Sequence, residues 1–141
     1  MKNSIKNGTL FLAGIAFVGF MFTAASMGGD KPAGKPWAAP DKDAKMAAPM
    51  KADEATLATG KEVWNQHCKS CHGKTGKGDG PKAENIEISC GDFTSADYTK
   101  QSDGALYYKT TEGRKPMPSF KQKLSDTERL AVTLYSKTFA K

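Results

Sequence analysis

The sequence predicts an all-α domain with three or more helices. Apolar residues between positions 55 and 68 recur at helical spacing, and Ser125 and Glu128 form a capping box ahead of a second periodic segment. No segment alternates apolar and polar residues convincingly, as a half-buried strand does. Much of the 38% hydrophobic content lies in the first 26 positions, so the domain itself is poor in core-forming side chains. A small domain of this kind needs a further source of stability, such as a bound cofactor.

The N-terminal segment has the three-part form of a secretory signal. Lys2 and Lys6 precede an apolar run, Leu10 to Phe22, and small residues follow it up to Ser26. We expect a signal peptide over residues 1–26. An uncleaved anchor is the alternative, because the run is at the lower limit of length for a spanning helix. We therefore expect an exported, periplasmic domain that associates with the inner membrane only if this segment is uncleaved.

Residues 27–52 are rich in Ala, Lys, Gly and Pro and show no sustained period, which predicts a flexible linker. This linker would be a tether if the leader stays in the membrane, and otherwise an extension without function. Residues 53–141 then form the domain. They hold 14 basic and 12 acidic groups, so most of the +6 net charge lies outside the domain. Bulk charge therefore gives no reason to expect nucleic acid as a partner.

The first helix of the domain is expected over residues 55–68. Gly60 and Trp64 lie four positions apart and so share one face of this helix. A glycine inside a helix lowers its stability, so we expect another helix to approach closely at Gly60, with Trp64 filling the space beside it. This helix delivers the next motif at its C-terminal end.

The run C-x-x-C-H occurs once in the chain, from Cys68 to His72. The thiols of Cys68 and Cys71 are about one helical turn apart and can form thioethers with two vinyl groups of a haem. The imidazole of His72 can then bind the iron from the same short segment. We expect one covalently attached haem c, with its iron, around which the helices wrap. The third cysteine, Cys90, has no cationic neighbour in the sequence and is assigned no role.

Two other interpretations of this motif are weaker. A zinc site would need His67 together with the three residues of the motif, and four ligands within six positions do not readily close a tetrahedron. A thioredoxin-like dithiol would sit beside a βαβ pattern, which the chain lacks.

Four glycines between positions 73 and 81 predict a loop after the motif. The loop lacks the spacing of a phosphate-binding loop and follows no predicted strand. We expect it to wrap the proximal side of the haem. The carbonyl of Pro81 is the candidate acceptor for the second imidazole nitrogen of His72, a bond that would orient the ring.

Two more helices follow. The first is expected to begin after Ser102 and to stop at Gly113, with Leu106 and one of the two following tyrosines facing the haem. The second begins after the capping box at Ser125, and its apolar face is expected to pack across the first helix at Gly60.

Met117 lies between these two helices and is the only methionine after the linker. A thioether is a soft ligand for low-spin haem iron, and a His/Met pair raises the reduction potential. Pro116 and Pro118 restrict the backbone on either side and keep the segment out of a helix. We therefore expect Met117 to bind the iron from the face opposite His72.

The order of these motifs resembles that of the class I monohaem cytochromes c of bacteria, over about residues 53–141. The matching features are Gly60 with Trp64, the Cys68–His72 run, the Gly-Asp-Gly-Pro81 loop, the Met117 segment and the C-terminal amphipathic helix. The resemblance implies the class I cytochrome c fold, with Cys68 and Cys71 as thioether residues and His72 and Met117 as axial ligands.

The function we expect is that of a one-electron carrier, not an enzyme, with redox proteins as partners. Basic residues flank both ligand segments and could form a rim that attracts an acidic docking surface. They are Lys69, Lys74, Lys77, Lys82, Arg114, Lys115, Lys121 and Lys123. The alternatives are a haem enzyme or a gas or redox sensor with an open or labile distal site, and a haem subunit of a larger dehydrogenase or oxidase complex.

Overall fold

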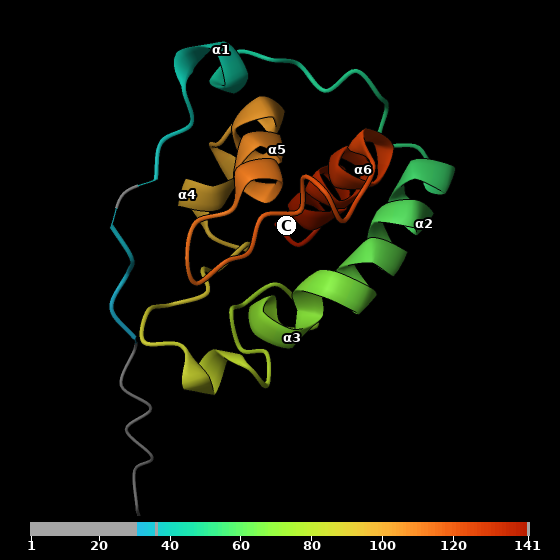
Figure 1. Ribbon diagram of the computed structural model, residues 1–141. Coiled ribbons are helices and arrows are strands. Elements are labelled where there is room, and N and C mark those ends of the chain that lie inside the picture. The colour runs from blue at the N-terminus through green and yellow to red at the C-terminus, as the bar shows by residue number, and fades with distance from the viewer. Residues whose placement is uncertain (1–30, 36, 141) are drawn as a thin grey trace, which may run out of the picture.

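The computed structural model describes residues 31–35 and 37–140, and it confirms the all-α prediction (Figure 1). Within these residues there is no strand. The helices are α1 (Asp41–Ala44), α2 (Glu54–Val63), the π-helical turn η1 (Trp64–Cys68), α3 (Lys69–His72), the 3₁₀ turn η2 (Ala83–Asn85), α4 (Ala96–Thr99), α5 (Asp103–Glu112) and α6 (Asp126–Lys137). The predicted leader lies outside the described residues. None of the helices described is long and apolar enough to cross a membrane.

The helix predicted over 55–68 begins at α2 and continues through η1 into α3. Asp53 caps it, because its carboxylate accepts a hydrogen bond of 2.9 Å from the N–H of Thr56. The N–H of Lys69 donates to the carbonyl of Trp64, five residues earlier, which is the π-helical pattern. The wider turn shifts the helical register just before the C-x-x-C-H run.

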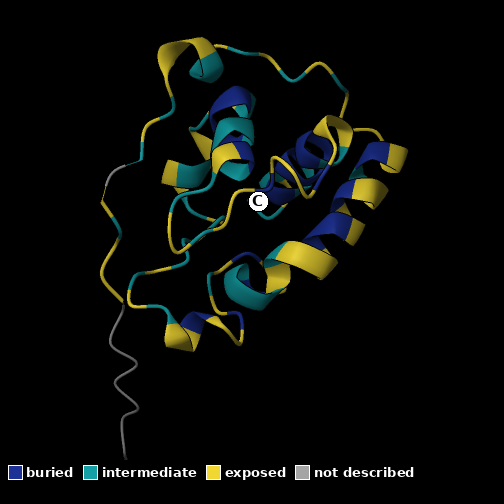
Figure 2. Ribbon diagram, viewed as in Figure 1, coloured by how far each residue is buried: buried dark blue, intermediate teal, exposed yellow. Residues whose placement is uncertain are grey.

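Helix α6 lies between α2 and α5 (Figure 1). Its close contact with α2 is at Gly60, as predicted. A Cβ at this position would lie 2.7 Å from both the carbonyl carbon of Ala131 and the Cβ of Tyr135. The buried faces of α2 and α6 meet along this contact (Figure 2). Because glycine has only a hydrogen atom in place of a side chain, the two backbones can approach this closely.

The core lies beside this crossing. It consists of Val63, Trp64, Phe120, Leu124 and Val132. Only 2% of Trp64 is exposed, and its indole N–H donates to the carbonyl of Gly73 at 3.1 Å. The tryptophan therefore joins the start of η1 to the start of the glycine-rich loop.

The predicted ends of α5 and α6 are confirmed. Ser102 caps α5, and the helix stops at Gly113, which has a φ of 65°. Ser125 and Glu128 form the expected capping box at the start of α6. The buried Arg129 of α6 donates to the carbonyls of Lys121 and Leu124, so it holds the preceding loop against the helix.

Residues 31–35 and 37–52, within the segment that the sequence predicts to be a flexible linker, are described and include helix α1. Helix α1 packs against α5, and the hydroxyl of Ser102 donates to the carbonyl of Ala44 at 2.5 Å. Composition suggested no structure here because the helix has only four residues and packs against α5, which is distant in sequence.

Replacing Gly60 with Ala should lower the free energy of unfolding by about 1–3 kcal/mol, because the added methyl group meets the backbone of α6. Thermal and denaturant unfolding of the haem-containing protein measure this change. Lys61→Ala at the exposed neighbouring position is the control. Equal stability of Gly60→Ala and the wild type would show that the two helices do not meet as closely as described.

Candidate haem-binding site

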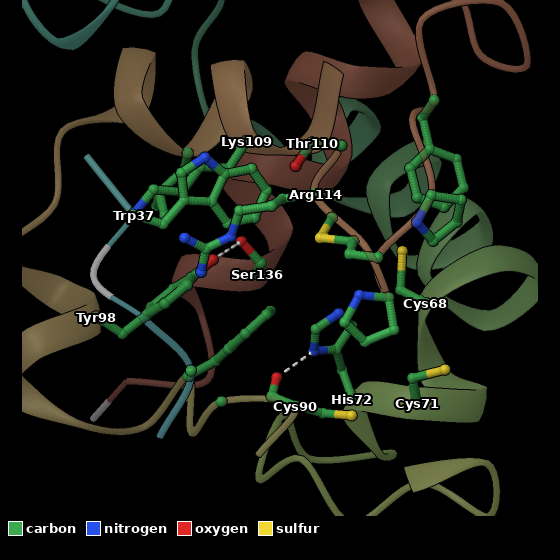
Figure 3. A pocket seen from close by; sticks show the side chains of 18 of the residues that line it. Trp37, Cys68, Cys71, His72, Cys90, Tyr98, Lys109, Thr110, Arg114 and Ser136 are labelled. Carbon is green, nitrogen blue, oxygen red and sulfur yellow. Dashed lines mark hydrogen bonds between the residues drawn. The ribbon is translucent and has the colours of Figure 1, made fainter. Parts of the chain in front are cut away.

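The residues predicted to hold haem meet at one cavity of about 310 Å³. Cys68, Cys71 and His72 line it from η1 and α3 (Figure 3). Met117 lines the same cavity from the loop between α5 and α6. Residues almost 50 positions apart in sequence thus face a common space.

The cavity wall is largely apolar. Its apolar side chains include Trp64, Ile86, Ile88, Phe93, Leu106, Pro116, Pro118, Phe120 and Val132. Leu106 takes the position that the sequence predicts. The tyrosine at the cavity is Tyr98 of α4. Neither of the two tyrosines that follow Leu106 lines the cavity. A wall of this kind suits a flat macrocycle with an apolar body.

The imidazole of His72 is oriented by the carbonyl of Cys90, which lies 2.7 Å from Nδ1 (Figure 3). The expected acceptor was the carbonyl of Pro81, and this prediction is corrected. The loop around Pro81 turns back onto α3, where the N–H of Lys82 donates to the carbonyl of Ser70 at 2.7 Å. The chain therefore passes His72 later, at Cys90.

This contact decides which nitrogen of His72 is available. With Nδ1–H donating to Cys90, Nε2 carries the lone pair that can bind a metal. Burial lowers the pKa of His72, although the hydrogen bond to Cys90 opposes this shift. The ring is thus kept in the neutral form that metal binding needs.

Burial and the neighbouring Cys71 raise the pKa of Cys68 to about 12. Its sulfur is therefore a neutral thiol in the protein without cofactor. Among residues 31–35 and 37–140, no group of three or more His, Cys, Asp or Glu side chains could hold a metal ion. The described residues therefore offer no zinc site at this motif.

Backbone hydrogen bonds hold the Met117 segment. The N–H of Met117 donates to the carbonyl of Arg114 at 2.8 Å, and the reverse bond from Arg114 measures 3.0 Å. Further along, the hydroxyl of Ser119 donates to the carbonyl of Thr111 at 2.7 Å. These contacts fix the loop to the end of α5, so the sulfur is carried by an ordered backbone.

Sequence reasoning assigned Arg114 to the basic rim but found neither Trp37 nor Lys109 at the cationic end of the cavity. There the ring of Trp37 lies 4.7 Å from the guanidinium carbon of Arg114 and 5.8 Å from the ammonium nitrogen of Lys109. The three residues lie together, away from Cys68 and Cys71 (Figure 3). The signal available for Lys109 was its place three positions after Leu106, on the same face of α5.

These features fit haem. Thiols at one end of the cavity suit the vinyl edge of the porphyrin, and the apolar wall suits its body. Lys109 and Arg114 at the other end suit the two carboxylates that a haem carries on its remaining edge.

Comparison with known proteins gives the same cofactor. The family model described as cytochrome c oxidase, cbb3-type, subunit III, matches residues 55–135. No curated protein sequence matches the chain.

Solved structures share the fold, and two of them illustrate the similarity. One belongs to the Kuenenia stuttgartiensis reducing HAO-like protein complex Kustc0457/Kustc0458, with 34% identity and a TM-score of 0.61. The match covers 66% of this chain and 47% of that one, so the chain spans about half the length of that relative. The other is the KustC0563 c-type cytochrome, with 31% identity and a TM-score of 0.51, over 58% of this chain and 98% of that one.

Thiol titration of the mature, haem-containing protein in denaturant is expected to find one reactive cysteine, Cys90. Thioethers should have consumed the other two of the three thiols, Cys68 and Cys71. Alkylation followed by mass spectrometry measures this. In the matched variant Cys90→Ser, no thiol should react and haem should stay attached, because the backbone of residue 90 contacts His72. Three reactive thiols in the haem-containing protein would rule out both attachment positions.

Proposed function

Because the chain belongs to the class I cytochromes c, in the domain family described as cytochrome c oxidase, cbb3-type, subunit III, we propose that it is an exported, periplasmic one-electron carrier with His72 and Met117 as axial iron ligands. Its cofactor is one covalently attached haem c. The observation that carries the proposal is the cavity that both proposed ligands and both thiols of the C-x-x-C-H run line.

Each of these residues has a task. Cys68 and Cys71 hold the macrocycle, the Cys90 carbonyl orients His72, and the pairing with Arg114 presents Met117. The haem supplies the Fe(III)/Fe(II) couple. If His72 and Met117 both bind the iron, no position would be left for a substrate at the metal, and the protein would act as a carrier and not as an enzyme or sensor.

The residues around the cavity favour the reduced, ferrous state of a haem iron bound there. The apolar wall disfavours the additional positive charge of the ferric form, and a thioether ligand acts in the same direction. None of the described residues that line the cavity is an Asp or Glu, whereas Lys109 and Arg114 add positive charge. We therefore expect the apolar wall, the thioether ligand and the two cations to raise the reduction potential.

Replacing Met117 with Ala should remove the methionine-to-iron charge-transfer band of the ferric protein and lower the reduction potential. The expected shift is at least about 59 mV, a tenfold change for one electron, because the thioether stabilises ferrous iron. Optical spectroscopy with redox titration measures both.

Met50→Ala is the control, since Met50 does not line the cavity. An unchanged potential in Met117→Ala would refute the ligand assignment. A high-spin spectrum of the wild-type protein would favour an open distal site and hence the enzyme or sensor function.

A second candidate function is that of a haem subunit in a larger redox complex. The observation that favours it is the likeness to a protein of the Kuenenia stuttgartiensis reducing HAO-like complex. Affinity purification of the chain from its own cell extract, followed by size-exclusion chromatography, tests this. Elution of all the haem at the mass of the single chain would argue against such a complex.

Oxidation or reduction by a protein partner should slow as ionic strength rises, because the basic rim would attract an acidic surface. Seven of the eight rim residues are exposed, and Arg114 is half-buried. In stopped-flow measurements at low salt, Lys115→Glu should lower the bimolecular rate by about threefold or more. Lys61→Glu, at an exposed position outside the rim, is the matched control. A rate that does not depend on salt would exclude electrostatic steering.

A further inference from the structure

The segment before α1 forms part of the cavity wall. Gly34 and Trp37 are among the residues that line the cavity, although they precede the predicted domain. Gly34 lies close to another lining residue, Ile88, because a Cβ at position 34 would lie 3.1 Å from Cδ1 of Ile88. The segment therefore closes one side of the site.

One end of this segment is held by the loop that follows α3. The ammonium group of Lys31 donates to three backbone carbonyls, those of Ala83 at 2.5 Å, Glu84 at 2.9 Å and Ile86 at 2.6 Å. Next to it, the N–H of Ser89 donates to the carbonyl of Pro32 at 3.0 Å. These bonds join the segment to the same loop that places Cys90 at His72.

The other end is held by α5. A Cβ at Gly104 would lie 2.6 Å from the carbonyl oxygen of Met46 and 3.0 Å from its Cβ. The chain after α1 thus rests directly on the first turn of α5, and Ser102 adds its hydrogen bond to Ala44.

Between these two ends, Trp37 meets the two cations of the cavity. Its ring faces both Arg114 and Lys109, and the guanidinium of Arg114 also donates to the carbonyl of Lys35 at 2.7 Å. Two neighbouring cations repel each other, and partial burial costs them hydration. An aromatic face offsets both effects, because its electrons attract each cation.

We propose that residues 31–35 and 37–46 form a fixed strap over the cavity, and that Trp37 is a positioning residue that holds Lys109 and Arg114 at the end remote from Cys68 and Cys71. The strap keeps water from that end of the site and keeps the two positive charges near the haem. Both effects stabilise the ferrous state. The inference rests on the proposed function only in its effect on the reduction potential, since the docking of the strap stands on protein contacts alone.

The test is made in the full-length, haem-containing protein with Trp37→Ala. Hydrogen exchange at the amide of Ser89 should become faster, because its bond to Pro32 is lost when the strap is released. The reduction potential should fall by about 28 mV, a threefold change in the one-electron equilibrium. Trp37→Phe, which keeps an aromatic face, should restore most of both values.

A second variant disturbs the strap through a substitution in α5. Gly104→Ala places a methyl group against Met46 and should raise exchange at Ser89 less than Trp37→Ala does, but more than the control. The control is Lys42→Ala, on the exposed side of α1.

Unchanged exchange at Ser89 in Trp37→Ala would overturn the strap. Faster exchange with an unchanged potential would overturn the positioning role of Trp37. If the wild-type protein lacks the optical spectrum of His/Met ligation, the proposed function is overturned instead. Hydrogen exchange at Ser89 would still decide whether the strap is docked.

Discussion

The close crossing of α2 and α6 at Gly60 positions both the core and the C-x-x-C-H run. It brings Trp64 into the core one turn later, where the indole N–H reaches the carbonyl of Gly73. The C-x-x-C-H run lies between these two anchored points, so its thiols and imidazole are fixed from both sides. A side chain at position 60 would separate the helices and move the whole motif relative to α6 and its core residue Val132.

The proximal side has a second support, an aromatic series that leads from His72 to α6. The ring of Phe93 lies 4.7 Å from that of His72 and stacks on Tyr98 at 4.2 Å. The hydroxyl of Tyr98 is hydrogen-bonded to Ser136 at 2.5 Å. Burial raises the pKa of this phenol, so it stays neutral. The same helix that packs on α2 therefore also restrains the ring that faces the proposed ligand.

Carbonyl groups, and not carboxylates, orient the proposed ligands. Cys90 contacts His72 through its backbone, and Arg114 pairs with Met117 in the same manner. A neutral acceptor at the imidazole stabilises ferric iron less than a carboxylate would, because it adds no full negative charge. Together with the cations beside Trp37, this choice of partners makes the cavity electrostatically suited to a haem of raised potential.

Features that depend on neighbours along the chain can be predicted from the sequence alone. The helix ends at Ser102, Gly113 and Ser125 follow from capping chemistry, and the pattern Cys68–His72 with a later Met117 predicts the cofactor. Other features follow from the fold alone: Cys90 contacts His72, Tyr98 lies at the cavity, and residues 31–35 and 37–46 pack on the domain. These contacts join segments far apart in sequence. The path of the loops and the packing of α5 and α6 determine which residues meet, and no periodic pattern in the sequence indicates these pairs.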